Sequence, residues 1–216
     1  MPKVSIIIPI YKAEAFIERC ARSLFEQTFK DIEYIFVNDA TPDGSIDILE
    51  KIISEYPERS NRCTIINHIK NKGQSVARND GLTVATGEYV FYCDSDDWIH
   101  PSMITDMYRA AITDQADAVV CDFQMVYQDK KVYYKTVDWT EDKYSSLRKY
   151  IAFGWTVLFN LLVKRTIYVD NKLSSLEGYA YCEDFNLAVK LLYHANKIVR
   201  IPYAYYYYWQ NENSIV

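Results

Sequence analysis

The sequence predicts an α/β fold in which helices cover both faces of a mostly parallel central sheet and a small antiparallel region follows. In the first 122 of the 216 residues, short apolar segments alternate with segments of helical periodicity, which is the order of a parallel sheet. Those apolar segments are continuous, as in strands that are buried on both faces. After Asp122 two short segments separated by a turn predict an antiparallel hairpin.

The first half of the chain predicts strands and helices in alternation. Residues 4–8 are β-branched and continuous, which favours a buried strand, and residues 15–27 carry apolar side chains at helical spacing. Turn residues at 41–44 then separate the second strand from the second helix. The remaining strands are expected at residues 33–38, 64–68, 89–93 and 118–122, and the remaining helices at 45–56, 74–85 and 101–111.

The second half is predicted to continue the same domain, because no repeat, low-complexity tract or glycine- and serine-rich linker divides it. Residues 155–163 are apolar and fit either a strand or a helix. The chain ends on Ile215 and Val216 without a polar tail, from which we expect a C-terminal truncation. The other expected elements are a hairpin at 123–128 and 131–137, helices at 141–152 and 183–193, a strand at 197–201 and an extended aromatic segment at 203–209.

Composition indicates a soluble globular protein. Half of the residues are hydrophobic and a quarter are charged, which excludes disordered, collagen-like and fibrous chains. The formal net charge is −5, so a basic surface for nucleic acid is not expected. An anionic substrate would therefore need a local cation, either a metal ion or a few arginine and lysine side chains.

Cysteine usage and hydropathy indicate a cytoplasmic location. The five cysteines are odd in number, widely spaced and without a C-x-x-C pair, which argues against a disulfide framework and a zinc site. The apolar run at residues 4–10 is too short to cross a bilayer, and no stretch reaches about 18 uncharged apolar residues. We therefore expect a cytoplasmic protein, with peripheral association at the inner face of the membrane left open.

The strongest candidate for chemistry is the acidic segment that follows the strand at residues 89–93. Asp94, Asp96 and Asp97 place three carboxylates within four residues, and such close like charges repel unless a cation neutralises them. Mg²⁺ or Mn²⁺ prefers oxygen ligands and takes one or two protein carboxylates together with substrate phosphates. An acidic surface turn is the alternative. The position favours a metal site, because ligands bind at the carboxyl ends of strands in such sheets.

Three other segments are weaker candidates when each is taken alone. Asp39 follows the second strand and suits a hydrogen bond to a base or ribose, although an aspartate that begins a turn is the simpler interpretation. Arg78 lies where a glycine turn meets a helix, which suits phosphate, with an exposed helical arginine as the alternative. Glu183 and Asp184 begin a helix, where their spacing favours capping over the role of a general base.

Other familiar patterns are missing from the sequence. There is neither a P-loop nor a G-x-G-x-x-G fingerprint, and the lack of G-x-S-x-G argues against a Ser-His-Asp hydrolase. His68, His100 and His194 have no metal or nucleophile partners at a recognisable spacing. The aromatic residues at 203–209 favour a half-buried strand over a stacking platform for sugars or bases.

In combination and in this order, the segments resemble the inverting family-2 glycosyltransferases, whose fold is the Rossmann-like GT-A fold. The match covers nearly the whole chain, and the ordered set is far more specific than any one segment. The matching segments are VSIIIPIY at 4–11, SLFEQT at 23–28, FVNDATPDGS at 36–45, NKG at 71–73, ARN at 77–79, TGEY at 86–89, DSDD at 94–97 and ED at 183–184.

The resemblance implies which residues bind the nucleotide. Pro9 and Tyr11 would flank the base, and Asp39 would hydrogen-bond it, uracil being the usual base. Arg78 would face the nucleotide or its diphosphate, and Asp94 would lie near the ribose. Residues 1–100 would form the nucleotide-binding half of a single domain, and residues 101–216 the half that holds the acceptor and the catalytic base.

The resemblance also implies a metal-dependent transfer of a sugar with inversion. Asp96 would bind Mn²⁺ or Mg²⁺ with Asp94 and Asp97 beside it, and Asp184 matches the usual catalytic base, next to Glu183. The donor would be a UDP-sugar and the acceptor a saccharide or lipid-linked saccharide in the synthesis of a surface polysaccharide or glycolipid. The sequence does not indicate an oligomeric state.

The chain departs from the family pattern in two places. The second-strand motif usually has two aspartates followed by Gly-Ser, whereas here Asn38 and Ala40 flank the single Asp39. Family members also commonly continue beyond residue 216.

Two alternative functions remain to be weighed. A sugar-phosphate nucleotidyltransferase would carry a glycine-rich basic loop after the first strand, but residues 9–14 contain no glycine. A non-catalytic subunit that binds nucleotide or carbohydrate is disfavoured by the intact acidic segments.

Overall fold

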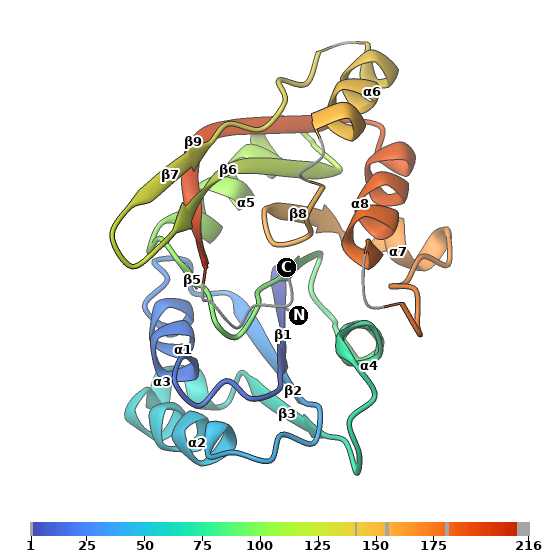
Figure 1. Cartoon of the computed structure of the whole chain (residues 1–216). Coiled ribbons are helices and arrows are strands. Elements are labelled where there is room, and N and C mark those ends of the chain that lie inside the picture. The colour runs from blue at the N-terminus through green and yellow to red at the C-terminus, as the bar shows by residue number, and fades with distance from the viewer. Residues whose placement is uncertain (1, 141, 154–155, 180–181, 211–216) are drawn as a thin grey trace.

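The computed structural model describes residues 2–140, 142–153, 156–179 and 182–210 of the chain. In this part, the centre is a nine-stranded sheet with the order β3-β2-β1-β4-β8-β6-β9-β5, and β7 pairs with β6 (Figure 1). Glu141, Trp155, Ile215 and Val216, which belong to predicted segments, lie outside the described residues.

The elements confirm the predicted alternation of strands and helices in the first half of the chain. The strands are β1 Val4–Ile10, β2 Ile32–Asn38, β3 Cys63–Asn67, β4 Tyr89–Tyr92, β5 Trp98–Ile99, β6 Ala118–Val126, β7 Lys131–Tyr134, β8 Leu161–Lys164 and β9 Ile198–Trp209. The helices are α1 Ile17–Phe25, α2 Ser45–Glu55, α3 Pro57–Ser60, α4 Gln74–Val84, α5 Met103–Thr113, α6 Lys143–Phe153, α7 Arg165–Asp170 and α8 Glu183–His194. The short elements α3, α7 and β5 were not predicted, because each is too short to show a periodic pattern of apolar residues.

The sheet is mostly parallel, as predicted. β1 pairs in parallel with β2 and β4, β2 with β3, and β6 with β9. Since β8 is antiparallel to both β4 and β6, these two strands run in the same direction on either side of it. β7 forms the expected antiparallel hairpin with β6.

Helices cover both faces of the sheet, because the strands bury alternate side chains on opposite sides. Ile6 and Ile8 pack in one core with α1, α2 and α5, whereas Ile7 packs in a second core with α4, α6, α7 and α8. Figure 1 shows α1 and α2 on the left of the sheet and α4, α7 and α8 on its right. This burial on both faces explains the continuous apolar pattern of β1.

The strand order changes direction between β1 and β4, and this junction positions the site. From β1 the chain proceeds outward to β2 and β3, then returns to place β4 on the other side of β1. The carbonyl oxygen of Ile7 accepts the backbone N–H of Cys93, and that of Ile10 accepts the backbone N–H of Asp39. The backbone hydrogen bonds of β1 therefore point alternately to its two neighbouring strands. Pro9 lies beyond the last paired residues of β1 and β4, so its missing N–H falls outside the paired part of these two strands. The crevice of a doubly wound sheet lies at such a junction.

Two predicted boundaries are wrong in the second half. Residues 118–122 and 123–128 belong largely to one strand, β6, which exchanges β8 for β7 as its antiparallel neighbour midway. Residues 197–201 and 203–209 likewise form one strand, β9, whose register against β6 shifts near Pro202. A change of pairing partner or a bulge does not interrupt the chain, so the sequence pattern suggested separate strands. The helix expected from residue 101 begins at Met103.

No described helix is both long and apolar enough to span a membrane.

Close packing of α4 on β1 generates a prediction for Gly81. A Cβ at this position would lie 2.5 Å from Cγ2 of Ile7. Gly81→Ala should therefore lower the free energy of unfolding by about 1–3 kcal/mol, although alanine favours a helix over glycine by about 1 kcal/mol. The control is Thr83→Ala at an exposed position of α4, which should stay within about 0.5 kcal/mol of wild type. Urea unfolding measures both, and an unchanged Gly81→Ala protein would contradict this packing.

Candidate functional site

Arg78 joins two acidic segments that are far apart in the sequence. It lies on α4 and is only 1% exposed, so the alternative of an ordinary exposed arginine is wrong. Its Nη1 donates to Oδ1 of Asp184, and its Nη2 donates to Oδ1 of Asp94 at 3.0 Å. Oε1 of Glu183 lies 3.8 Å from Nη1. The loop after β4 and the start of α8 therefore meet at one buried guanidinium.

Burial controls the ionisation of this cluster. It acts to lower the pKa of Arg78, but Asp184 and Asp94 outweigh it and hold that pKa above its ordinary value, so the guanidinium stays charged. Burial raises the pKa of Asp184 to about 6, with Arg78 opposing the increase and Asp94 and Glu183 adding to it. One guanidinium thus faces three carboxylates, so the cluster has an excess of negative charge that a further cation would offset.

Glu183 and Asp184 lie in the first turn of α8, where the helix dipole favours carboxylates, as the capping interpretation expects. The N-terminus of α8 has no side-chain capping hydrogen bond among the described residues, and Cys182 precedes it with a left-handed φ of 62°. Asp184 points instead to Arg78 through Oδ1. Its Oδ2 accepts no hydrogen bond from a described residue, and its side chain is 21% exposed. This oxygen is able to accept a proton.

Asp94 and Asp96 have the chemistry of a partial metal site. Asp94 accepts from Gln74 and Arg78 through Oδ1, whereas the carboxylate of Asp96 accepts from no other described residue. Burial, followed by the charge of Asp94, raises the pKa of Asp96 to about 6, and the charge of Arg19 opposes this increase only in part. No group of three or more His, Cys, Asp or Glu side chains suited to a metal exists among the described residues. The two aspartates fit a hard cation whose other ligands are substrate oxygens and water.

Asp97 does not fit the metal set expected for it. It is fully buried, and both of its carboxylate oxygens already accept hydrogen bonds, Oδ2 from the hydroxyl of Tyr206 at 2.6 Å and Oδ1 from the backbone of Trp209 at 2.7 Å. Burial and the neighbouring carboxylates of Asp96 and Asp94 raise its pKa well above the ordinary value. We therefore leave Asp97 out of the proposed metal ligands.

Asp39 organises the loop before α4. Its Oδ1 accepts the backbone N–H of Lys72 at 2.7 Å and lies 2.7 Å from Nδ1 of His68, and its Oδ2 accepts the N–H of Gly73 at 2.8 Å. A carboxylate oxygen has about two acceptor positions, so Oδ2 keeps one for a ligand. His68 also contacts Asp80 through Nε2 at 2.9 Å. The glycine turn therefore belongs to the same site as Asp39.

Pro9 and Tyr11 occupy different environments at the end of β1. Pro9 is buried within the strand, opposite Val37 of β2. Tyr11 follows the strand and is 44% exposed, so its ring is accessible for stacking. Lys12 then turns the chain with a φ of 54°, and its backbone N–H donates to Thr41 at 2.7 Å. The turn after β1 and the turn after β2 are thus joined beside Tyr11.

Sequence reasoning missed several residues that shape this site. His68 lies 29 residues from its partner Asp39, and Tyr206 lies 109 residues from Asp97. Arg19 of α1 donates from Nη2 to the carbonyl oxygen of Asp96 at 2.9 Å. The aromatic density at 203–209 was a signal for a packed strand but not for the single hydroxyl that reaches the acidic segment.

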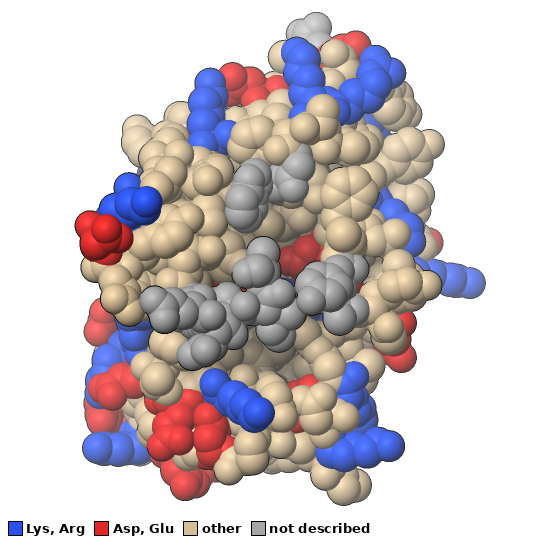
Figure 2. Space-filling view, viewed as in Figure 1, with Lys and Arg blue, Asp and Glu red and all other residues tan. Residues whose placement is uncertain are grey.

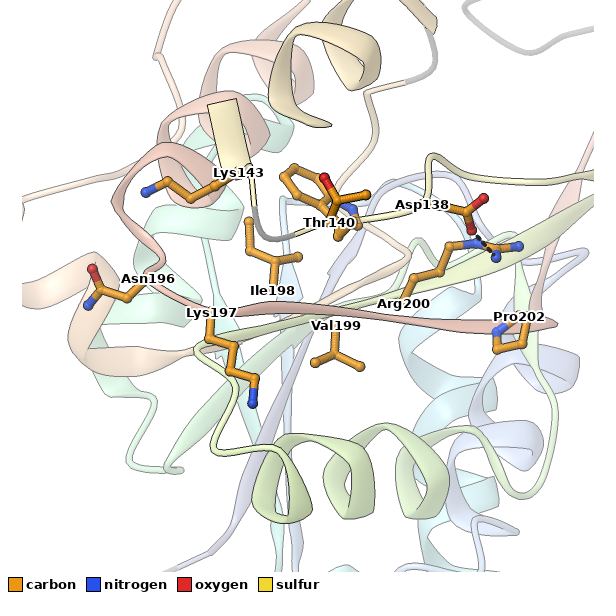
Figure 3. A pocket seen from close by; sticks show the side chains of 10 residues that line it. Asp138, Thr140, Lys143, Asn196, Lys197, Ile198, Val199, Arg200 and Pro202 are labelled. Atoms are coloured by element: carbon orange, nitrogen blue, oxygen red, sulfur yellow. Dashed lines mark hydrogen bonds and ion pairs between the residues drawn. The ribbon is translucent and has the colours of Figure 1, made fainter. Parts of the chain in front are cut away.

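The charged surface and a hollow beside β9 add little to the site. Figure 2 shows Lys and Arg side chains gathered along the upper edge of this face, around α6, and Asp and Glu side chains clustered at the lower left, near α2. A separate hollow lies between residues 138–140 with Lys143 on one side and residues 196–202 on the other (Figure 3). Its Arg200 pairs with Asp138 at 2.7 Å, and its Lys143 donates to carbonyl groups at the end of α8. None of its lining residues is a predicted site residue.

Comparison with known sequences identifies relatives along the chain. The profile of glycosyl transferase family 2 matches residues 5–166. The uncharacterized glycosyltransferase EpsJ of Bacillus subtilis is 32% identical over an alignment that covers 100% of this chain and 63% of EpsJ. A poly(ribitol-phosphate) beta-glucosyltransferase of Bacillus spizizenii is 30% identical over 95% of this chain and 32% of its own. The chain therefore spans less than two thirds of the length of these relatives.

Solved structures confirm the expected GT-A architecture. S. aureus TarS 1-349 in complex with UDP-GlcNAc superposes with a TM-score of 0.84 at 24% identity and covers 98% of this chain and 60% of its own. The mannosyltransferase PcManGT of Pyrobaculum calidifontis, in complex with GDP-Man and Mn²⁺, superposes with a TM-score of 0.73 at 19% identity, over 99% of this chain and 58% of its own. At these identities the likeness shows the fold alone.

The family profile covers most of the chain, and the fold and the order of the acidic segments agree with it. This chain belongs to glycosyl transferase family 2.

Proposed function

We propose that this chain transfers a sugar from a UDP-sugar to a hydroxyl group of a saccharide or lipid-linked saccharide, with inversion at the anomeric carbon. The observation that carries the proposal is the contact of Arg78 with both Asp94 and Asp184. This contact brings Asp94, on the side proposed for the sugar donor, next to Asp184, which is suited to act as a base. Family membership supports sugar transfer, and the UDP-GlcNAc bound by TarS supports a uridine donor.

The donor nucleotide is proposed to lie at the carboxyl ends of β1, β2 and β4. The exposed ring of Tyr11 suits stacking on the base, and Pro9 shapes the end of the strand before it. The remaining acceptor position on Asp39 suits the N3–H of uracil, which cytosine lacks. Arg78 supplies fixed positive charge beside Asp94 on the diphosphate side.

The acidic segment is proposed to hold Mn²⁺ or Mg²⁺ through Asp96 and Asp94. When bound, such a cation supplies Lewis-acid stabilisation of the charge on the leaving diphosphate. Three carboxylates face the single guanidinium of Arg78, and the carboxylate of Asp96 accepts no hydrogen bond from another described residue and has a raised pKa; both observations support this assignment. The Mn²⁺ in the PcManGT complex supports a metal in this fold.

Asp184 is proposed to be the general base. Its Oδ2 takes the proton of the acceptor hydroxyl, whose oxygen then bonds to the anomeric carbon of the donor. The bond from that carbon to the diphosphate oxygen breaks, and its electron pair leaves with UDP. Because attack and departure occur on opposite faces, one displacement inverts the configuration. Glu183 contributes by adding to the increase in the pKa of Asp184.

The acceptor is proposed to be a growing surface polysaccharide or a glycolipid, built in the cytoplasm or at the inner face of the membrane. The name of the Bacillus spizizenii relative, a poly(ribitol-phosphate) glucosyltransferase, supports a polymeric acceptor. An acceptor screen tests this class, and glycosylation of small soluble metabolites alone would contradict it.

Calorimetric titration tests the donor site. UDP should bind more tightly with Mn²⁺ than without it, and more tightly than GDP or CDP. Asp96→Asn should weaken binding in the presence of Mn²⁺ by about 10–100-fold, because the cation loses its least compensated ligand, and should leave metal-free binding unchanged. Asp129→Asn, at an exposed turn, is the matched control. Equal Mn²⁺-dependent affinities for wild type and Asp96→Asn would exclude this ligand.

Asp184→Asn tests the catalytic base. The amide keeps an oxygen for Arg78 but cannot take a proton, so kcat should fall about 10²–10⁴-fold while UDP affinity is retained. The control is Asp170→Asn, an exposed carboxylate on α7, which should leave kcat unchanged. Transfer at the wild-type rate by Asp184→Asn would remove Asp184 from this role.

The raised pKa of Asp184 predicts a pH dependence of transfer. The base acts only when ionised, so kcat at saturating donor and metal should decrease as the pH falls through about 6, approaching about tenfold per pH unit. The measurement is an initial-rate profile, accompanied by UDP binding at each pH. A kcat that is constant from about pH 7 to about pH 5 would contradict the assignment.

A further inference from the structure

The acidic loop, which we define as residues 94–97, is tied to the last strand of the sheet by one hydroxyl group. Tyr206 of β9 is fully buried, and its hydroxyl donates to Oδ2 of Asp97 at 2.6 Å. The hydroxyl oxygen of Tyr206 in turn accepts the backbone N–H of Asp94 at 3.1 Å. The backbone of Trp209 donates to the other oxygen of Asp97 at 2.7 Å. Tyr206 thus holds both ends of the acidic loop.

The opposite side of the acidic loop rests on α1. Nη2 of Arg19 donates to the carbonyl oxygen of Asp96 at 2.9 Å, and the guanidinium carbon lies 3.7 Å from the centroid of the Trp98 ring. Sγ of Cys20 lies 3.6 Å from the carbonyl oxygen of Asp94. The contacts of Arg19 and Cys20 with the loop itself go to backbone carbonyl oxygens, so they fix the course of the loop without occupying the carboxylate oxygens of Asp94 or Asp96.

Holding this loop in place opposes electrostatic repulsion. Asp94, Asp96 and Asp97 would separate if the loop were free to move, because close carboxylates repel. Burying Asp97 is also unfavourable unless donors satisfy its oxygens, and Tyr206 and Trp209 provide them. Asp97 therefore fastens the acidic loop to β9, while the carboxylates of Asp94 and Asp96 stay partly exposed at the site.

We propose that Tyr206, acting through Asp97 and the backbone of Asp94, is a positioning residue that presents Asp94 and Asp96 to a divalent cation. This inference rests on the proposed function, since it assigns a support to the proposed metal ligands. Groups that orient metal ligands typically change metal affinity by about 10–100-fold when they are removed. The effect is expected on metal-dependent binding rather than on the fold.

The chain offers a matched pair of tyrosines for the test. Tyr206→Phe removes only the hydroxyl and keeps the ring, which stacks on Phe159 with centroids 4.3 Å apart. Tyr205, its neighbour on β9, donates to Oδ2 of Asp106 on α5, also at 2.6 Å. Tyr205→Phe therefore breaks the same kind of hydrogen bond, of the same length and on the same strand, but outside the acidic loop.

The experiment compares wild type, Tyr206→Phe and Tyr205→Phe in calorimetric titrations of UDP with and without Mn²⁺. Tyr206→Phe should weaken Mn²⁺-dependent binding at least about tenfold and leave metal-free binding unchanged, whereas Tyr205→Phe should match wild type in both. Hydrogen exchange provides a readout without ligand. The amide of Asp94 should exchange faster in Tyr206→Phe only, because it loses its acceptor.

Asp97→Asn reaches the same contact from the other side. It should also weaken Mn²⁺-dependent binding. In the double variant with Tyr206→Phe the loss of binding free energy should be smaller than the sum of the two single losses, because the two residues share one hydrogen bond. This variant also keeps the inference testable if Tyr206→Phe folds poorly.

Three outcomes would overturn the inference. Wild-type affinity in Tyr206→Phe would show that the hydroxyl is dispensable, and equal losses in Tyr206→Phe and Tyr205→Phe would indicate a general effect of strand packing. If wild type binds UDP equally with and without Mn²⁺, the metal part of the proposed function fails and the inference fails with it. That case differs from the first two, because it already appears in the unmodified protein.

Discussion

The buried ion-pair cluster of Arg78 is the interaction on which the candidate site depends. A guanidinium without access to water must be paired, and removing one partner of such a pair typically costs about 3–5 kcal/mol. The partners here come from the loop after β4 and the start of α8, which are separated by about ninety residues of chain. Pairing Arg78 therefore also brings Asp94, on the side proposed for the sugar donor, next to the candidate base Asp184. The same ion pairs thus stabilise the fold and assemble the candidate site.

The topology of the sheet delivers these partners to one place. Because β8 runs antiparallel between β4 and β6, the chain that follows it crosses to the face of α4 and forms α7 and α8 there (Figure 1). β9 then pairs with β6 and continues to β5, with Ile99 opposite Tyr206. This last pairing brings the end of the chain against the acidic loop, so the loop is supported by α1 on one side and by β9 on the other.

Aspartates of similar sequence context have different environments in this site. Asp97 is buried and satisfied by two donors, and Asp94 is shared with Arg78 and Gln74. The carboxylate of Asp96 accepts no hydrogen bond from another described residue and interacts with Arg19 through charge alone. Asp39 is nearly saturated by backbone N–H groups and His68. Because desolvation and neighbouring charges decide the ionisation of a carboxylate, the environment rather than the residue type separates an anchor from a ligand.

The sequence by itself determined the longer strands and helices of the first half of the chain and the positions of the acidic segments. Burial on both faces requires continuous apolar strands and a helix requires apolar residues at its own spacing, so β1 to β4 and their helices could be predicted. The ordered motifs also indicated the family. Only the tertiary structure decided that β6 and β9 are single strands, that Arg78 is buried, that Asp97 is an anchor and that His68 and Tyr206 belong to the site. These depend on contacts between residues up to 112 positions apart, and local periodicity carries no information about such distant partners.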